Sequence, residues 1–280
     1  MHKITVKQAF CSPELIGTQV RLYGCVRSVR HQKKFFFAAI NDGSYFDSLQ
    51  VVADETLPDY QNIVATLTLG ASVCAEGMLV NSVGKNQQVE IQLQQLRVIG
   101  SCDPTHYPLQ KKRHSFEYLR QIAHLRPRTN TQGAVFRVRN ALSVATHLFF
   151  QKQGFLYIQT PIITPLDCEG GGEMFSVQSE KRDFFKKPVY LTVSGQLEAE
   201  ICATALSKVY TFGPTFRAEN SHTSRHLAEF WMIEPEMAFC DLQQNMATAE
   251  DYLQSVVNYV LSHCERDLRF FDERIEPGLI

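Results

Sequence analysis

Apolar and polar residues alternate along most of the first hundred residues, which is the pattern of strands with one buried face. Turn residues such as Asn41-Asp42-Gly43 separate the alternating segments. Between Pro58 and Leu69 the spacing of apolar residues becomes helical. The pattern therefore predicts five strands and one short helix. The predicted strands cover residues 18–30, 34–40, 47–53, 70–80 and 87–99.

The order of these elements narrows the choice of fold. Three strands, a helix and two more strands follow the order of an OB-fold, a small all-β barrel whose strand face binds single-stranded nucleic acid. Small barrels of other topology fit the same pattern and stay open as alternatives. We expect an OB-fold domain over residues 1–103.

The pattern changes after this domain. Residues 104–128 contain three prolines and one short helix that Ser115 can cap. From Thr131 a helical spacing of apolar residues continues to Gly154. We therefore predict a hinge at 104–128 and a second domain over 129–280.

Composition excludes several classes of protein. The chain has 280 residues, 44% of them hydrophobic, and a net charge of -1, so it has room for two cores and no global attraction to nucleic acid. Its eight cysteines include no CxxC pair, which argues against a zinc site or a disulfide framework and for a reducing compartment. No apolar run approaches the ~18 residues of a membrane span. We expect a cytoplasmic protein with no metal centre and no membrane association.

Two local clusters of basic residues stand out against this neutral background. The first lies between Ile16 and Asn41 beside three phenylalanines, and exposed aromatics next to arginines form platforms for stacking bases. A solvated basic edge beside core phenylalanines is the alternative. The second lies in the hinge and can contact a phosphate backbone or remain solvated. The clusters are Arg21, Arg27, Arg30, Lys33 and Lys34, and Lys111, Lys112, Arg113, Arg120, Arg126 and Arg128.

Residues 208–239 predict two strands joined by a polar loop. Strand periodicity puts Arg217 and Glu219 on one face of the first strand, and Phe230, Glu234 and Glu236 on one face of the second. Such a face is unsuited to a core. Such a face can bind a ligand that combines several anionic groups with a flat base. An arginine binds phosphate and carboxylate oxygens bidentately, and an aromatic ring stacks on a purine.

The sequence FRAENSHTSRHLAEFWMIEPE resembles the second signature motif of class II aminoacyl-tRNA synthetases, in the form of the aspartyl and asparaginyl branch. The resemblance implies an α+β catalytic domain, an antiparallel sheet with flanking helices, and ATP as substrate together with Mg2+. It also implies that Arg217 contacts the α-phosphate and the amino-acid carboxylate. The ATP-binding residues that it implies are Arg217, Glu219, Arg225, His226 and Phe230.

The same resemblance extends to other segments. The barrel resembles the anticodon-binding domain of this branch, and the segment GFLYIQTPIITP, which predicts a strand, resembles the first motif, which builds a homodimer interface. CEGGGEMF resembles the loop that closes over the amino acid. The implied anticodon contacts are Arg27, Phe35, Gln50 and Glu90, and the implied amino-acid contacts are Glu169, Ser194, Gln196, Glu200 and Arg217.

The choice between asparagine and aspartate depends on the segment VSGQLEAE. Ser194 is the predicted N-cap of its helix, and Leu197, Ile201 and Ala205 are its predicted buried side. This helix has Ala199 where the aspartyl branch has a lysine that receives the substrate carboxylate. A buried carboxylate without a cation costs several kcal/mol, whereas a carboxamide can donate to Glu200. The resemblance therefore implies asparagine, ATP and tRNA(Asn) as substrates.

Three alternatives remain: an aspartyl enzyme, a tRNA-independent amino-acid ligase, and a non-catalytic RNA-binding fragment. The third arises because a glycine-rich third motif with its arginine is missing after Glu236. We therefore expect a truncated catalytic domain, incomplete at its C-terminal end. We expect the barrel to fold and bind RNA weakly, and the catalytic half to expose apolar surface and not to form the adenylate alone.

Overall fold

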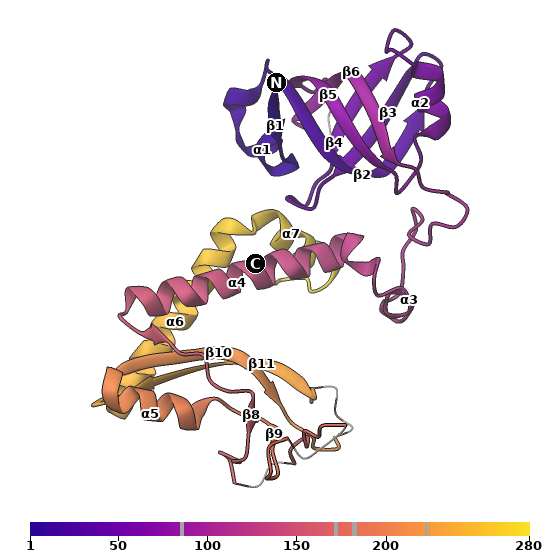
Figure 1. Cartoon of the computed structure of the whole chain (residues 1–280). Coiled ribbons are helices and arrows are strands. Elements are labelled where there is room, and N and C mark those ends of the chain that lie inside the picture. Colours follow the sequence, from indigo (N-terminus) through magenta and orange to yellow (C-terminus); the bar gives the residue numbers. More distant parts are fainter. Residues whose placement is uncertain (85–86, 171–172, 181–183, 222, 224) are drawn as a thin grey trace. The chain divides into compact units, whose positions relative to one another are not determined.

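The computed structural model describes residues 1–84, 87–170, 173–180, 184–221, 223 and 225–280 (Figure 1). The chain divides into two compact units, one of residues 1–138 with 264–280 and one of residues 139–263. The border between them falls inside helix α4 (Asn130–Lys152). Each unit contains its own sheet.

A closed barrel forms most of the first unit (Figure 1). Its sheet has the order β1-β2-β3-β4-β6-β5, and β2 also pairs with β5, so five strands close on themselves. Helix α2 lies between β4 and β5 in the chain. This is the predicted OB-fold, with every predicted strand within about two residues of its place. The elements are β1 (His2–Ile4), α1 (Val6–Cys11), β2 (Gln19–His31), β3 (Phe35–Asn41), β4 (Leu49–Asp54), α2 (Tyr60–Thr66), β5 (Ser72–Asn81) and β6 (Val89–Gly100).

The barrel closes because alternate side chains fill its interior. Leu22, Phe36 and Ile91 are fully buried in one continuous core. Strands β5 and β6 approach closely at Gly77, where a Cβ would lie 2.0 Å from the carbonyl oxygen of Gln92. Glycine is therefore required at this position.

The remainder of the first unit contains the hinge and two helices. The hydroxyl of Ser115 accepts from the backbone N–H of Tyr118, which confirms it as the N-cap of α3 (Phe116–Gln121). A short 3-10 turn, Arg126–Arg128, leads into α4. Arg137 of α4 donates bidentately to Asp267 of α7 (Glu265–Arg274), with a shortest distance of 2.7 Å. This ion pair joins two helices far apart in the sequence.

The predicted two-stranded ribbon forms the sheet of the second unit. β10 (Lys208–Phe216) pairs antiparallel with β11 (Glu229–Met237), and the short β7 (Leu156–Tyr157) adds parallel to β10. The strand predicted in GFLYIQTPIITP to end at Pro161 is the short β7, and a second strand, β8, follows Pro161. β8 (Ile163–Thr164) pairs with β9 (Tyr190–Leu191).

Helices cover both faces of this sheet (Figure 1). On one face Phe150 of α4 stacks on Tyr210 at 4.6 Å and on Tyr252 of α6 (Leu242–His263) at 5.3 Å. On the other face α5 (Gln196–Leu206) packs Ala199 and Ala203 against Val209. The predicted buried side of α5, with Leu197, Ile201 and Ala205, is wrong: Ile201 is 70% exposed, since small residues let this helix approach the sheet.

No helix in the described residues is long and apolar enough to cross a membrane.

Candidate functional site

The face of the β10–β11 ribbon that carries polar residues lies under α5. Thr211 pairs with Glu234 and Thr215 with Phe230, so these residues share one face. Tyr210 belongs to the opposite face, which packs on α4 and α6. The predicted separation of polar and apolar faces is therefore confirmed.

Arg217 lies just beyond the end of β10, at one end of this face. Its Nη2 donates to Glu169 Oε1 at 2.6 Å, and its guanidinium carbon lies 5.4 Å from the ring centre of Phe230. The Nε–H is buried and has no hydrogen-bond partner in the described part of the chain. A buried donor without a partner is costly, so an anionic group at this point would be stabilised.

Glu169 reaches Arg217 from a loop distant in sequence. Its backbone N–H donates to Asp167 at 3.0 Å, which fixes the start of the loop. Of the three glycines in the predicted closing loop, Gly171 and Gly172 lie outside the described residues. The structure thus brings together three of the predicted residues, Glu169, Arg217 and Phe230.

The start of α5 is held by the carboxylate of Glu234. This group accepts hydrogen bonds from the Ser194 hydroxyl, from the Gly195 N–H at 3.2 Å and from the Thr211 hydroxyl at 2.7 Å. A Cβ on Gly195 would lie 2.7 Å from Thr160 Oγ1, so only glycine fits beside this carboxylate. The prediction of Ser194 as the N-cap is wrong by one residue: Gly195 is the N-cap of α5, which begins at Gln196, because the Ser194 hydroxyl donates to Glu234 and accepts from the Gln196 N–H at 3.1 Å.

The first turn of α5 also carries the side chains predicted to select the amino acid. Gln196 donates to Glu200 at 2.8 Å, as their spacing predicts. Burial, and then the charges of Glu200 and Glu234, raise the pKa of Glu236. Ala199 is fully buried against β10. The described part of this turn thus presents carboxylates and a carboxamide, and no cation.

Three predicted ATP contacts lie apart from this group. Glu219, Arg225 and His226 are exposed. His226 forms a hydrogen bond with Thr223, and within the described segments no hydrogen bond or ion pair joins these three residues to Arg217. Their assignment to ATP stays a prediction.

The barrel carries a second candidate site, on the outer face of β3, β4 and β6. Phe35 is 43% exposed there, and Gln50 donates to Glu90 at 3.1 Å. Glu90 is itself buried and also accepts from Ser82 at 2.7 Å. An exposed ring beside an ordered amide and carboxylate can stack on a base and bind its polar edge.

Arg27, the fourth predicted anticodon contact, is not on this face. A bulge interrupts the β2–β3 register between Val26 and Ser28, and it directs Arg27 toward the hinge, where it donates to the Arg128 carbonyl and to Asn130. Arg30 lies opposite Phe37, 4.9 Å from its ring centre. Arg30 belongs to the predicted basic cluster but not to the predicted anticodon contacts; its pairing with Phe37 across β2 and β3 places it on the same face as Phe37.

A metal site is not built into the described residues. They contain no group of three or more His, Cys, Asp or Glu side chains placed to hold a metal ion. All eight cysteines are free.

Two known protein families match this chain, one over the barrel and one over most of the rest. Residues 115–276, more than half of it, match the family of tRNA synthetases class II (D, K and N). Residues 20–99 match the OB-fold nucleic acid binding domain.

Individual relatives agree with the family match. The chain is 57% identical over 281 residues to an asparagine–tRNA ligase of Protochlamydia amoebophila, covering 95% of this chain and 60% of the relative. It is 58% identical over 272 residues to one from Nostoc, with coverage of 92% and 59%. A crystal structure of asparaginyl-tRNA synthetase from Pyrococcus horikoshii complexed with asparaginyl-adenylate matches with a TM-score of 0.85 and 29% identity, covering 97% of this chain and 61% of that one. The chain therefore spans about 60% of the length of the curated relatives it matches.

Proposed function

The chain belongs to the class II tRNA synthetases of the D, K and N group, and we propose that it supplies the tRNA-binding barrel and part of the catalytic site of an asparagine–tRNA ligase. The reaction joins the carboxylate of asparagine to the α-phosphate of ATP and releases pyrophosphate; the tRNA(Asn) hydroxyl then takes the asparaginyl group from this adenylate and AMP leaves. The observation that carries the proposal is the Arg217 guanidinium. It bonds to Glu169, lies beside Phe230 and keeps a buried N–H without a partner.

The proposed chemistry depends on positioning and charge neutralisation. Arg217 contacts both the α-phosphate and the attacking carboxylate, which brings the two reacting groups together and offsets their repulsion. Phe230 stacks on the adenine. Magnesium arrives with ATP as part of the substrate. Glu219, Arg225 and His226 complete the proposed ATP contacts.

The amino acid binds at the first turn of α5. Glu169 takes its α-ammonium group, and the ordered Ser194 and Gln196 lie beside it. The carboxamide of asparagine donates to Glu200, whereas the carboxylate of aspartate is repelled by this charge. The absence of a cation from the described part of this turn supports asparagine over aspartate.

The barrel face binds the anticodon. Phe35 stacks on a base, and Gln50 and Glu90 bind base edges, an assignment that their shared outer face supports. By binding tRNA, the barrel contributes to the second step of the reaction, in which the asparaginyl group is transferred to the tRNA.

Two further observations support the proposed localisation and the proposed homodimer. Eight free cysteines support a reducing cytoplasm. Leu142 and Leu148 of α4 and Leu156 of β7 are 39%, 55% and 48% exposed, which supports a homodimer interface along the first motif.

A chimera tests the proposal, with this chain replacing the matching part of the Protochlamydia relative. We expect it to attach asparagine, and not aspartate, to tRNA(Asn), and we expect Arg217→Gln to abolish this. A chimera that prefers aspartate, or an Arg217→Gln variant with full activity, would refute the assignment.

A further inference from the structure

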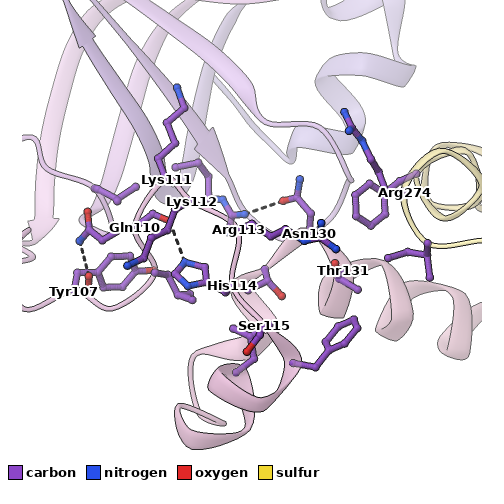
Figure 2. A pocket seen from close by; sticks show the side chains of 18 of the residues that line it. Tyr107, Gln110, Lys111, Lys112, Arg113, His114, Ser115, Asn130, Thr131 and Arg274 are labelled. Carbon is purple, nitrogen blue, oxygen red and sulfur yellow. Dashed lines mark hydrogen bonds between the residues drawn. The ribbon is translucent and has the colours of Figure 1, made fainter.

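A large cavity in the first unit lies away from the base-binding face of the barrel. It has a volume of about 1270 Å3 and is lined by β2, the hinge, the start of α4 and α7. Figure 2 shows hinge residues 111–113 on one side of it and Arg274 of α7 on the other. The cations lining it outnumber the carboxylates Glu117 and Glu273 by five to two. These cations are Arg27, Lys111, Lys112, Arg113 and Arg274.

These five cations have no ion-pair partner in the part of the chain that the structure describes. None of the ion pairs found among the described residues includes any of the five, although eight other basic side chains do form such pairs. Arg269, five residues before Arg274 on the same helix, is paired with Glu265 at 2.6 Å. The cavity therefore concentrates positive charge that has no internal partner.

Arg27 is the half-buried member of this group. The β2 bulge directs it to the cavity, and two of its N–H donors bind the Arg128 carbonyl and the Asn130 side chain. A guanidinium has five donors, so three remain. Burial lowers its pKa, and no carboxylate is among the groups that oppose this effect. A half-buried cation with only neutral partners is stabilised by an external anion.

We propose that this cavity is a phosphate-binding site, separate from the base-binding face that carries Phe35. Phosphate fits because several oxygens can bind arginine and lysine donors that converge from separate elements. The volume exceeds that of one phosphate and suits a run of backbone phosphates or a nucleotide. If the bound phosphates belong to RNA, the inference rests on the proposed tRNA function. If they belong to a free nucleotide, it does not.

Binding measurements on the 280-residue chain test the site. Three single variants, Arg27→Gln, Lys112→Gln and Arg274→Gln, are compared with the matched control Arg269→Gln, whose charge change lies on α7 but outside the cavity. Lys112 and Arg274 are exposed, so those two variants keep the fold. Affinity for a tRNA(Asn) transcript is measured over a range of salt concentrations.

We expect each cavity variant to weaken tRNA binding about tenfold and to lower the slope of log affinity against log salt by about 0.7–0.9, the value for one phosphate contact. The Arg269 control should leave the slope unchanged. A second arm measures ATP binding in an Arg217→Gln background, which removes the candidate active site. Loss of ATP affinity in the cavity variants, without loss of tRNA affinity, would assign the site to free nucleotides.

Unchanged tRNA and ATP binding in all three variants would overturn the phosphate site. Phe35→Ala distinguishes this result from failure of the proposed function. If Phe35→Ala weakens tRNA binding and the cavity variants do not, the tRNA function stands and the phosphate site fails. If the wild-type chain binds neither tRNA nor ATP in these assays, the phosphate site fails as well.

Discussion

The barrel and the β10–β11 sheet differ in how far each completes its own packing. Five barrel strands close into a ring around a continuous buried core. The second sheet has only three strands among the described residues, with β11 and β7 at its edges. Trp231 of β11 is 49% exposed, and Leu253 and Val257 of α6 are 60% and 52% exposed. The barrel therefore has the contacts of a self-sufficient domain, while the sheet leaves apolar surface open.

This difference bears on the two candidate sites. The base-binding residues lie on a scaffold whose strands are paired on both sides. Arg217 lies just beyond the end of a ribbon whose neighbour β11 is an edge strand. Accurate placement of a reacting group requires a rigid support, so we expect RNA binding to need less of the surrounding chain than adenylate formation.

The largest expected effect is a loss of stability in the second unit that leaves the stability of the first unchanged. Phe150→Ala removes a ring that is 1% exposed and stacked on Tyr210, and should destabilise the second unit by about 3–5 kcal/mol. Urea unfolding followed by hydrogen exchange should show this loss in residues 139–263, with barrel amides unaffected. The exposed Phe184 provides the control, Phe184→Ala. Equal loss of protection in the barrel would show that the units unfold as one.

The next effect concerns the barrel face alone. Phe35→Ala should weaken tRNA binding by about 1–3 kcal/mol, the scale of one lost stack. Phe35 is 43% exposed, so folding should not change. Fluorescence titration with a tRNA(Asn) transcript measures the affinity. A variant that binds as tightly as wild type would remove Phe35 from the interface.

A smaller effect is expected at the start of α5. In the chimera, Glu200→Gln should reduce the preference for asparagine over aspartate about tenfold, or about 1.4 kcal/mol, because the repelling charge is removed. The ratio of kcat/KM for the two amino acids measures this. Glu198→Gln, on the same turn, is the control. An unchanged ratio would exclude Glu200 from amino-acid selection.

The smallest effect is a pH dependence of stability. The pKa of Glu236 is raised above its ordinary value of 4.5 by burial and by Glu200 and Glu234, so the folded state binds this proton more tightly than the unfolded state. This contribution therefore favours the folded second unit below the ordinary pKa. It is lost as pH rises through the folded pKa. Unfolding midpoints measured upward from pH 4 should show the trend, and Glu236→Gln should flatten it; an equal slope in both proteins would exclude Glu236 as its source.

The sequence predicted elements best where one pattern dominates. The barrel strands follow strict alternation, so their order and the closed fold were predictable. The resemblance placed Arg27 with the base-binding residues, and the one-residue bulge that directs it elsewhere leaves no mark in composition. In α5 the large residues Leu197 and Ile201 favoured the wrong buried side, since close packing on β10 selects the small Ala199 and Ala203.

The catalytic residues were predictable by resemblance, and their contacts were not. The ribbon pattern placed Arg217, Phe230 and Glu234 on one face. The hydrogen bonds that Ser194 and Gly195 donate to Glu234 join residues about forty positions apart, and no local sequence pattern encodes such pairs. The hydrogen bond from Arg217 to Glu169 also joins residues that are distant in the sequence.

The contrast between the closed barrel and the open three-stranded sheet is tested most directly by ATP–pyrophosphate exchange, measured on the 280-residue chain and on the chimera with asparagine or aspartate. We predict exchange with asparagine in the chimera, none with the 280-residue chain, and tRNA binding by both. Asparagine-dependent exchange by the 280-residue chain alone would contradict the account, because the ribbon and α5 would then suffice to form the adenylate.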